Sequence, residues 1–278
     1  MNRRFLGIAL ALLLIVPLCV VSCGDDGTTD PGNGTPANLP DLPEAEIGTT
    51  IDFQNDNPQA QAAEGLVQTQ LVAAQAISSM SAGLLAPLES AAWGNAGNDC
   101  WSWSYTYEGC TATYEVCETA EGYAWTFTMD GTCIEGESAY DNWVAWSGTT
   151  NSDGTLGTMQ WYDSNTTTVI GSCTWSVAAD RSSGTWNFYE GTVATANLIA
   201  TMAWRVNQDG SQDITWTMPE VMKWEAHVAA DGLSGWMRLY SWESNSWVLT
   251  GEITWMTNGT GWWKTYNSEG EVITEDIW

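Results

Sequence analysis

Four short segments of this chain share the pattern Gly-x4-Tyr and recur at regular spacing. They begin at Gly157, Gly184, Gly235 and Gly261, which are 27, 51 and 26 residues apart, and the double gap holds Gly210 as a degenerate member. Turn sequences containing Asp-Gly and Asn-Gly pairs separate several of them, and such pairs favour tight hairpins. The spacing predicts a series of β-hairpin units of about 26 residues each.

Alternation of apolar and polar residues predicts two different faces for these hairpins. The returning strands carry tryptophans at Trp146, Trp175, Trp204, Trp224 and Trp255. One apolar side is expected to hold Leu198, Ala200, Met202, Trp204 and Val206, and in another strand Trp247, Leu249, Gly251, Ile253 and Trp255. The tyrosines fall on the polar side. Residues 93–278 are therefore predicted to be mainly β, an antiparallel up-and-down meander of degenerate hairpin repeats that forms a large curved sheet or an open barrel.

Residues 59–92 have the periodicity of one amphipathic helix. Apolar residues such as Leu66, Val67 and Leu71 recur near every 3.6 residues. Interspersed glutamines and serines, among them Gln68 and Gln75, favour a packed helix over a second membrane span. We expect this helix to lie against the apolar face of the sheet.

The N-terminus has the layout of an export signal. Arg3 and Arg4 precede an apolar run, and Val20-Val21-Ser22-Cys23 follows it. This segment resembles the type II signal peptide and lipobox of bacterial lipoproteins. The resemblance implies that residues 1–22 are removed, that Cys23 is acylated, and that the membrane is a partner through this anchor. Several acyl chains would hold the protein stably.

Residues 23–58 are rich in Gly, Pro, Thr and Asp and are predicted to be a disordered tether. Gly24, rather than aspartate, follows Cys23, which favours the outer membrane of the cell envelope. Asp25 and Asp26 resemble the acidic signal that sends some lipoproteins to the cell surface, or they are solvated linker charges. The domain is thus expected on the periplasmic side or on the cell surface.

The chain is strongly acidic, with 34 acidic residues against 7 basic ones and a formal net charge of −27. Arg3 and Arg4 lie in the leader, so the mature chain keeps few cations. Phosphate binding requires clustered Lys and Arg, so we expect no nucleic-acid partner.

Five cysteines lie in the predicted β domain, so one must stay free or pair elsewhere. A two-residue turn at Glu108 and Gly109 would place Cys100 opposite Cys117. The next hairpin, turning near Glu121, would bring Cys110 towards Cys133 and leave Cys173 buried on the apolar face. A register shift of one or two residues would allow other pairings.

Catalytic motifs are absent from the sequence. His227 is the sole histidine, and it is expected on the polar side of its strand with Lys223 and Glu225. No Cys-x2-Cys pair is present, so neither a metal nor another cofactor is expected. We expect no enzyme activity; the alternative is a glycoside hydrolase that uses two of the carboxylates.

Two binding hypotheses remain, beside a purely structural role as a spacer or scaffold. In the first, outward aromatic side chains bind a glycan; these are Tyr162, Tyr189, Trp236, Tyr240, Trp242, Trp262 and Tyr266, which otherwise serve as cross-strand packing pairs. In the second, a cavity under the helix carries a lipid or another apolar ligand, or that face is simply a filled core. The repeat resembles MORN-type hairpin repeats, and the helix with its meander resembles the open barrels of lipoprotein carriers, but neither resemblance assigns a function.

Overall fold

A computed structural model describes residues 47, 48, 50–78, 94–97, 99–133 and 139–278. The signal peptide, Cys23, most of the tether and residues 79–92 of the predicted helix lie outside these residues. The elements are α2 (Pro58–Ser78), β1 (Gly94–Gly97), β2 (Cys100–Tyr107), β3 (Cys110–Thr119), β4 (Gly122–Gly131), β5 (Tyr140–Asn151), β6 (Leu156–Tyr162), β7 (Val169–Val177), β8 (Ser183–Glu190), the short 3-10 helix η2 (Thr195–Asn197), β9 (Leu198–Val206), β10 (Gln212–Met218), β11 (Met222–Val228), β12 (Gly235–Glu243), β13 (Ser246–Trp255), β14 (Gly261–Tyr266) and β15 (Val272–Ile277).

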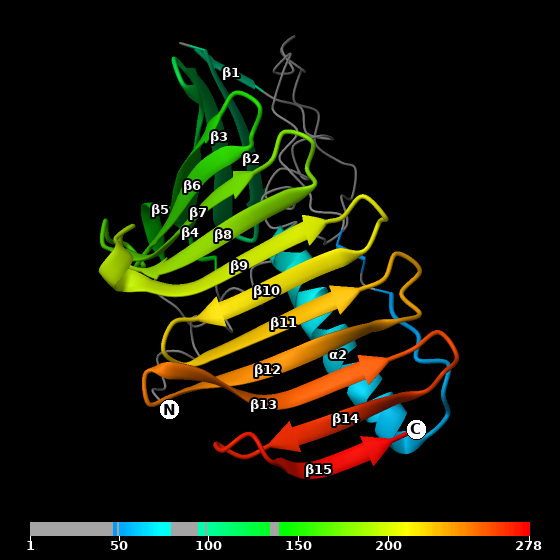
Figure 1. The fold of residues 1–278 in the computed structure, drawn as a ribbon. Helices are drawn as coiled ribbons and strands as arrows, with labels where there is room; N and C mark the ends of the chain where they lie inside the picture. Colours follow the sequence, from blue (N-terminus) through cyan, green and yellow to red (C-terminus); the bar gives the residue numbers. More distant parts are fainter. Residues whose placement is uncertain (1–46, 49, 79–93, 98, 134–138) are drawn as a thin grey trace.

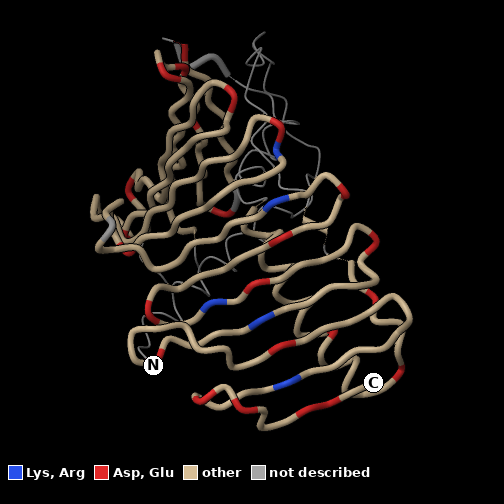
Figure 2. Tube along the Cα trace, viewed as in Figure 1, with Lys and Arg blue, Asp and Glu red and all other residues tan. Residues whose placement is uncertain are grey.

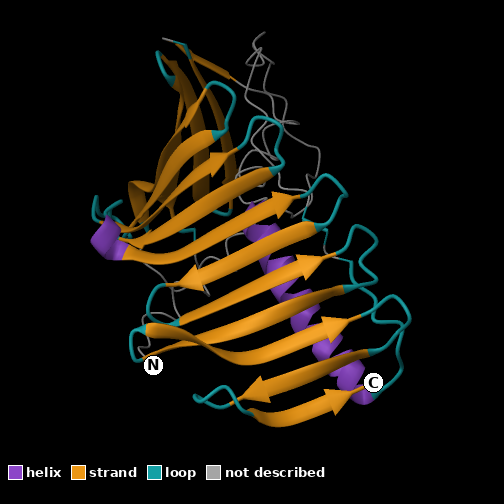
Figure 3. Ribbon diagram, in the orientation of Figure 1, coloured by secondary structure: helices purple, strands orange, loops and turns teal. Residues whose placement is uncertain are grey.

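All strands of the described residues belong to one sheet of 15 strands, and each strand pairs with its neighbours in sequence. Every pairing is antiparallel, from β1–β2 to β14–β15. The sheet twists along its length and stays open, and α2 crosses behind its C-terminal half (Figures 1 and 3). The predicted mainly β meander with one helix is therefore confirmed, as a curved open sheet.

Cross-strand packing explains the glycine of each repeat. Gly184 lies directly opposite Trp204, and a Cβ at Gly184 would overlap that indole ring. The same pairing joins Gly157 to Trp175, Gly235 to Trp255 and Gly261 to Trp278. Glycine is required because the opposite indole fills the space that a side chain would occupy. In the β10 unit the equivalent residue is Gln212, opposite Val228, and Gly210 belongs to the preceding turn.

The tyrosine of each repeat lies at a β-bulge. The register shifts between Trp161 and Tyr162, Phe188 and Tyr189, Leu239 and Tyr240, and Thr265 and Tyr266. A bulge leaves one residue of the partner strand unpaired, so the alternation of that strand changes side there. Leu198, Trp247 and Leu249 therefore do not share the apolar side of Ala200 and Ile253, as the uninterrupted alternation predicted, but pair with Tyr189, Trp242 and Tyr240.

The core lies between α2 and one face of the sheet. Val67 and Leu71 of α2 are fully buried, and they pack with sheet residues that include Trp186, Met202 and Trp255. The predicted core tryptophans Trp146, Trp175, Trp204, Trp224 and Trp255 are all buried. The described helix begins at Pro58, with Asn57 accepting a hydrogen bond from the Gln59 amide at its first turn. Among the described residues, no helix is long and apolar enough to cross a membrane.

The segment before α2 comprises residues 47, 48 and 50–57, and we call it the strap. It packs along the hairpin turns at one end of the strands. Its Gly48 amide donates to the Gln212 side chain at 2.7 Å, and the Asn55 side chain donates to the Gly259 carbonyl at 2.7 Å. Ile47, Ile51 and Phe53 are buried. Figure 1 shows the strap in blue beside the hairpin turns. The prediction of a disordered tether as far as residue 58 is therefore wrong for the strap, because three apolar side chains anchor it.

Both predicted disulfides are present. Cys100 is bonded to Cys117 and Cys110 to Cys133, across the β2–β3 and β3–β4 hairpins, and Cys173 is a free buried thiol. The turn at Glu108 and Gly109 sets this register, with Tyr107 opposite Cys110. Burial raises the pKa of the Cys173 thiol, which keeps it protonated and unreactive.

Candidate functional site

One face of the sheet packs against α2. The other face, which points away from α2 and which we call the outer face, carries long rows of polar and aromatic side chains. Directly opposite residues of antiparallel strands project on the same side, so the register defines the rows. The aromatic row runs over β9–β14 and holds Arg205, Asp213, His227, Trp236, Thr254 and Trp262. The charged row runs over β11–β15 and holds Glu225, Arg238, Glu252, Lys264 and Glu275.

Acidic and basic residues alternate along the charged row (Figure 2). Arg238 Nε lies 2.9 Å from Glu252 Oε1, and Lys264 Nζ lies 2.9 Å from Glu275 Oε1. Hydrogen bonding to Glu252 raises the pKa of the Arg238 guanidinium, and hydrogen bonding to Glu275 raises the pKa of the Lys264 ammonium. The row therefore pairs most of its charges internally and fixes the positions of its long side chains.

These cations also contact the outer aromatic side chains. The Arg238 guanidinium lies 4.6 Å from the ring centroid of Trp236, and the Lys264 ammonium lies 5.5 Å from that of Trp262. Lys223 Nζ lies 4.2 Å from the Tyr240 ring. Such cation–π contacts restrain a ring at a surface. Trp236 and Trp262 stay partly exposed, so each presents part of an oriented indole to solvent.

The repeat tyrosines bridge neighbouring strands through their hydroxyl groups. Tyr240 donates to Glu225 at 3.1 Å, and Tyr266 donates to Glu252 at 3.2 Å. Desolvation is the largest cause that raises the pKa of both tyrosines, followed by the nearby carboxylates. Tyr162 pairs with the Ser147 hydroxyl at 2.8 Å. These tyrosines hold the sheet together as well as lining its outer face.

The structure brings together five of the seven predicted ligand-binding residues. Trp236, Tyr240 and Trp242 lie on β12, and Trp262 and Tyr266 lie on β14. Tyr162 and Tyr189 lie on the more distant strands β6 and β8. Trp247 also belongs to the outer face, in edge-to-face contact with Trp242 at 4.9 Å between centroids. The bulge that moves Trp247 outward has no signal in the alternation pattern, so the sequence interpretation missed it.

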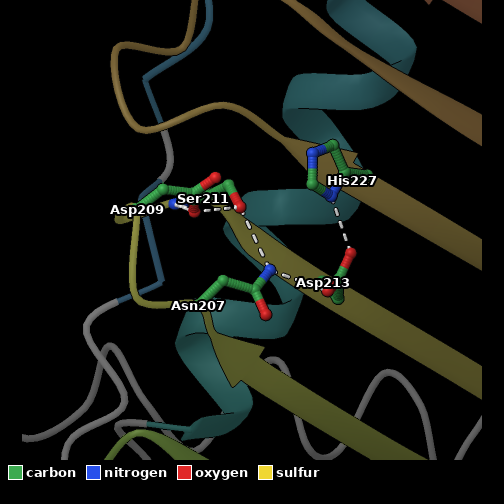
Figure 4. Close-up of polar contacts among 5 residues, drawn as sticks. All are labelled: Asn207, Asp209, Ser211, Asp213 and His227. Carbon is green, nitrogen blue, oxygen red and sulfur yellow. Dashed lines mark hydrogen bonds and ion pairs between the residues drawn. The ribbon is translucent and has the colours of Figure 1, made fainter.

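A polar cluster lies at the β9–β10 turn, at the end of the aromatic row (Figure 4). Asp213 Oδ1 lies 2.7 Å from His227 Nδ1, and Asp213 Oδ2 accepts from the Asn207 side chain at 2.9 Å. Desolvation acts to raise the pKa of Asp213, but these hydrogen bonds, together with the charges of His227 and Arg205, outweigh it and lower that pKa. His227 therefore lies on the polar face, beside Glu225 and Lys223 of its own strand, as predicted.

The cluster has no arrangement for nucleophilic catalysis. Ser211 donates its hydroxyl to Asp209 at 2.7 Å and accepts from Asn207, so His227 does not take part in its hydrogen bonds. Hydrogen bonds from Ser211 lower the pKa of Asp209, which suits a turn-capping carboxylate. What the cluster offers is a set of oriented donors and acceptors at the surface. Within the described ranges, no three His, Cys, Asp or Glu residues are grouped as metal ligands.

Comparison with known proteins gives no further assignment. No protein-family model matches the chain, and no curated protein matches it.

Proposed function

We propose that this chain is a lipid-anchored protein of the bacterial cell envelope, attached to the outer membrane through Cys23, whose outer face binds a glycan without catalysis. The observation that carries the proposal is the pairing of Trp236 and Trp262 in one row, two strands apart, each restrained by a cation. Two strand spacings are about 9.6 Å. Sugar rings carry apolar C–H faces that pack on indoles, and their hydroxyls hydrogen-bond to charged groups.

The surroundings of these indoles support the same interpretation. Hydroxyls of a sugar chain would meet the charged row immediately beside the aromatic row, where Arg238 and Glu252 are already oriented. The opposite face of the sheet is occupied by α2, whose fully buried Val67 and Leu71 pack into the core. The outer face is therefore the broad surface on which a polymer has room to lie.

Binding is tested by titrating the domain with soluble oligosaccharides. Tryptophan fluorescence and the heat of binding, measured by calorimetry, are followed during the titration. We expect Trp236→Ala and Trp262→Ala each to weaken binding about tenfold, as for an aromatic residue that anchors an interface. Circular dichroism is expected to stay unchanged, because both side chains lie on the outer face.

Tyr105→Ala is the matched control. Tyr105 is an aromatic residue that is 55% exposed on β2, far along the sheet from β12 and β14. This variant is expected to bind like the parent protein. Equal loss in the Tyr105 variant, or none in the two tryptophan variants, would show that the aromatic row is not the binding surface.

The anchor is tested separately. The protein is isolated from a bacterial membrane fraction, and its N-terminal peptide is analysed by mass spectrometry. We expect this peptide to begin at Cys23 and to carry acyl chains. A peptide that retains residues 1–22 or lacks lipid contradicts the anchor. Protease treatment of intact cells then distinguishes the cell surface from the periplasmic side, since a surface domain is cleaved without permeabilising the outer membrane.

A further inference from the structure

The outer face contains a shallow hollow over β7–β10. Its volume is about 400 Å³, which lies within the range of about 300–1,000 Å³ typical of ligand sites. Ser176, Thr185, Ala203, Arg205, Asp213 and Thr215 are among the residues that line it. Arg205 and Asp213 are direct neighbours in the aromatic row, so the hollow continues the surface that includes Trp236.

The hollow exists because short side chains continue the charged row. Beyond Glu225, the next positions across the sheet are Thr215, Ala203, Thr185 and Ser176. On β11–β15 the same row holds Glu, Arg and Lys side chains. Side chains in this row therefore project less far from the sheet on β7–β10 than on β11–β15. The hydroxyl groups of the threonines and the serine form the floor of the hollow.

Arg205 differs from the other basic residues of the outer face. Lys223, Arg238 and Lys264 each form an ion pair with a glutamate. Arg205 is exposed and, among the described residues, has no carboxylate within 4.0 Å of its guanidinium. Asp213, which faces it across the strands, is hydrogen-bonded to His227 and Asn207, and the charge of Arg205 helps to lower the pKa of Asp213 although the two side chains form no ion pair. The guanidinium is thus left available in a chain that is otherwise short of cations.

We infer that the hollow is a subsite for a carboxylate-bearing sugar, with Arg205 binding the carboxylate and the floor hydroxyls binding ring oxygens. This inference rests on the proposed glycan function. A guanidinium binds a carboxylate through two parallel hydrogen bonds, which gives both affinity and orientation. Arg205 and Trp236 are three strands apart in one row, about 14 Å. An oligosaccharide of a few units would reach from the hollow to the indole.

The test compares a galacturonic acid tetramer with its methyl ester, which removes the charges and keeps the sugar chain. We expect the parent protein to bind the acid about tenfold more tightly than the ester, as for one charge-assisted hydrogen-bonded pair. Arg205→Gln is expected to abolish this preference. Ala203→Phe, which fills the floor of the hollow, is expected to abolish it as well. Arg181→Gln removes the same charge from the β7–β8 turn, outside the hollow lining, and should keep the preference.

Four outcomes would overturn the inference. Equal binding of acid and ester by the parent protein removes the carboxylate subsite but leaves glycan binding by the tryptophans. Retention of the preference in Arg205→Gln assigns it to another group. Equal loss in Arg181→Gln shows a general charge effect. Absence of binding to acid and ester alike contradicts both the inference and the proposed function. A preference for the acid that is lost in Arg205→Gln but unaffected by Trp236→Ala supports the carboxylate subsite and not the role of Trp236.

Discussion

Gly235→Ala is expected to lower the free energy of unfolding by about 3 kcal/mol, the upper part of the usual range for overpacking a filled site. Gly235 lies opposite Trp255 and beside β11. A Cβ there would overlap the His227 carbonyl oxygen and the Trp255 ring. Trp255 is almost fully buried and donates its indole N–H to the Gly232 carbonyl at 3.2 Å, so the ring has little freedom to move away. Urea unfolding followed by circular dichroism measures the change.

The matched control is Gly65→Ala. Gly65 lies within α2, and nothing approaches the position of its Cβ within 4 Å. The same substitution should therefore stabilise the protein by about 0.5–1 kcal/mol, because alanine favours a helix more than glycine does. Opposite signs for the two glycine variants support the role of the Gly–Trp pair. A loss below about 1 kcal/mol in Gly235→Ala would mean that the strands separate easily and that the repeat glycine has no packing role.

Local rules were enough to predict the hairpins and the disulfides. A two-residue turn fixes the register of both flanking strands, so the turn at Glu108 and Gly109 determines that Cys100 faces Cys117. The bulges could not be predicted in this way. An inserted residue such as Thr250 looks like part of a continuous strand, and its effect becomes visible only when Leu239 and Tyr240 are seen to pair with Gly251 and Leu249.

The candidate site was also predictable only as far as local rules reach, here the alternation of side chains along a strand. Trp236 and Trp262 alternate outward along their own strands, so sequence alone places each of them on the correct face. Their arrangement in one row with His227 and Arg205 depends on the register of five successive pairings. The hollow depends on the relative lengths of side chains from four consecutive strands, β7–β10, which only the register brings side by side. Such a feature has no local pattern to reveal it.

The strap was missed because its composition resembles that of a tether. Gly, Thr, Asp and Asn surround its apolar residues, and low hydrophobicity is the usual sign of disorder. Its backbone nevertheless finds partners on α2: the Ile51 amide donates to Gln68, and the Phe53 amide donates to Glu64. Gln68, one of the polar helix residues that argued against a membrane span, thus helps to hold the strap.

Phe53→Ala is expected to lower the free energy of unfolding by about 3–5 kcal/mol, the range found when a buried phenylalanine is truncated. Phe53 is fully buried, and its ring stacks on Trp255 at 4.9 Å and on Trp278 at 5.8 Å between centroids. It therefore joins the strap to the strands that end the sheet. Hydrogen exchange should also show loss of protection at Asp52, whose amide donates to the Gly232 carbonyl.

Val72→Ala controls for the loss of an apolar side chain, because Val72 lies on α2 but is 49% exposed. Its effect is expected to stay within about 0.5 kcal/mol, as is usual for a surface substitution. If the Phe53 variant were equally mild, the strap would be a loosely attached segment, and the open sheet would be stable without it. If the expected loss is found, the strap is an integral part of the folded domain.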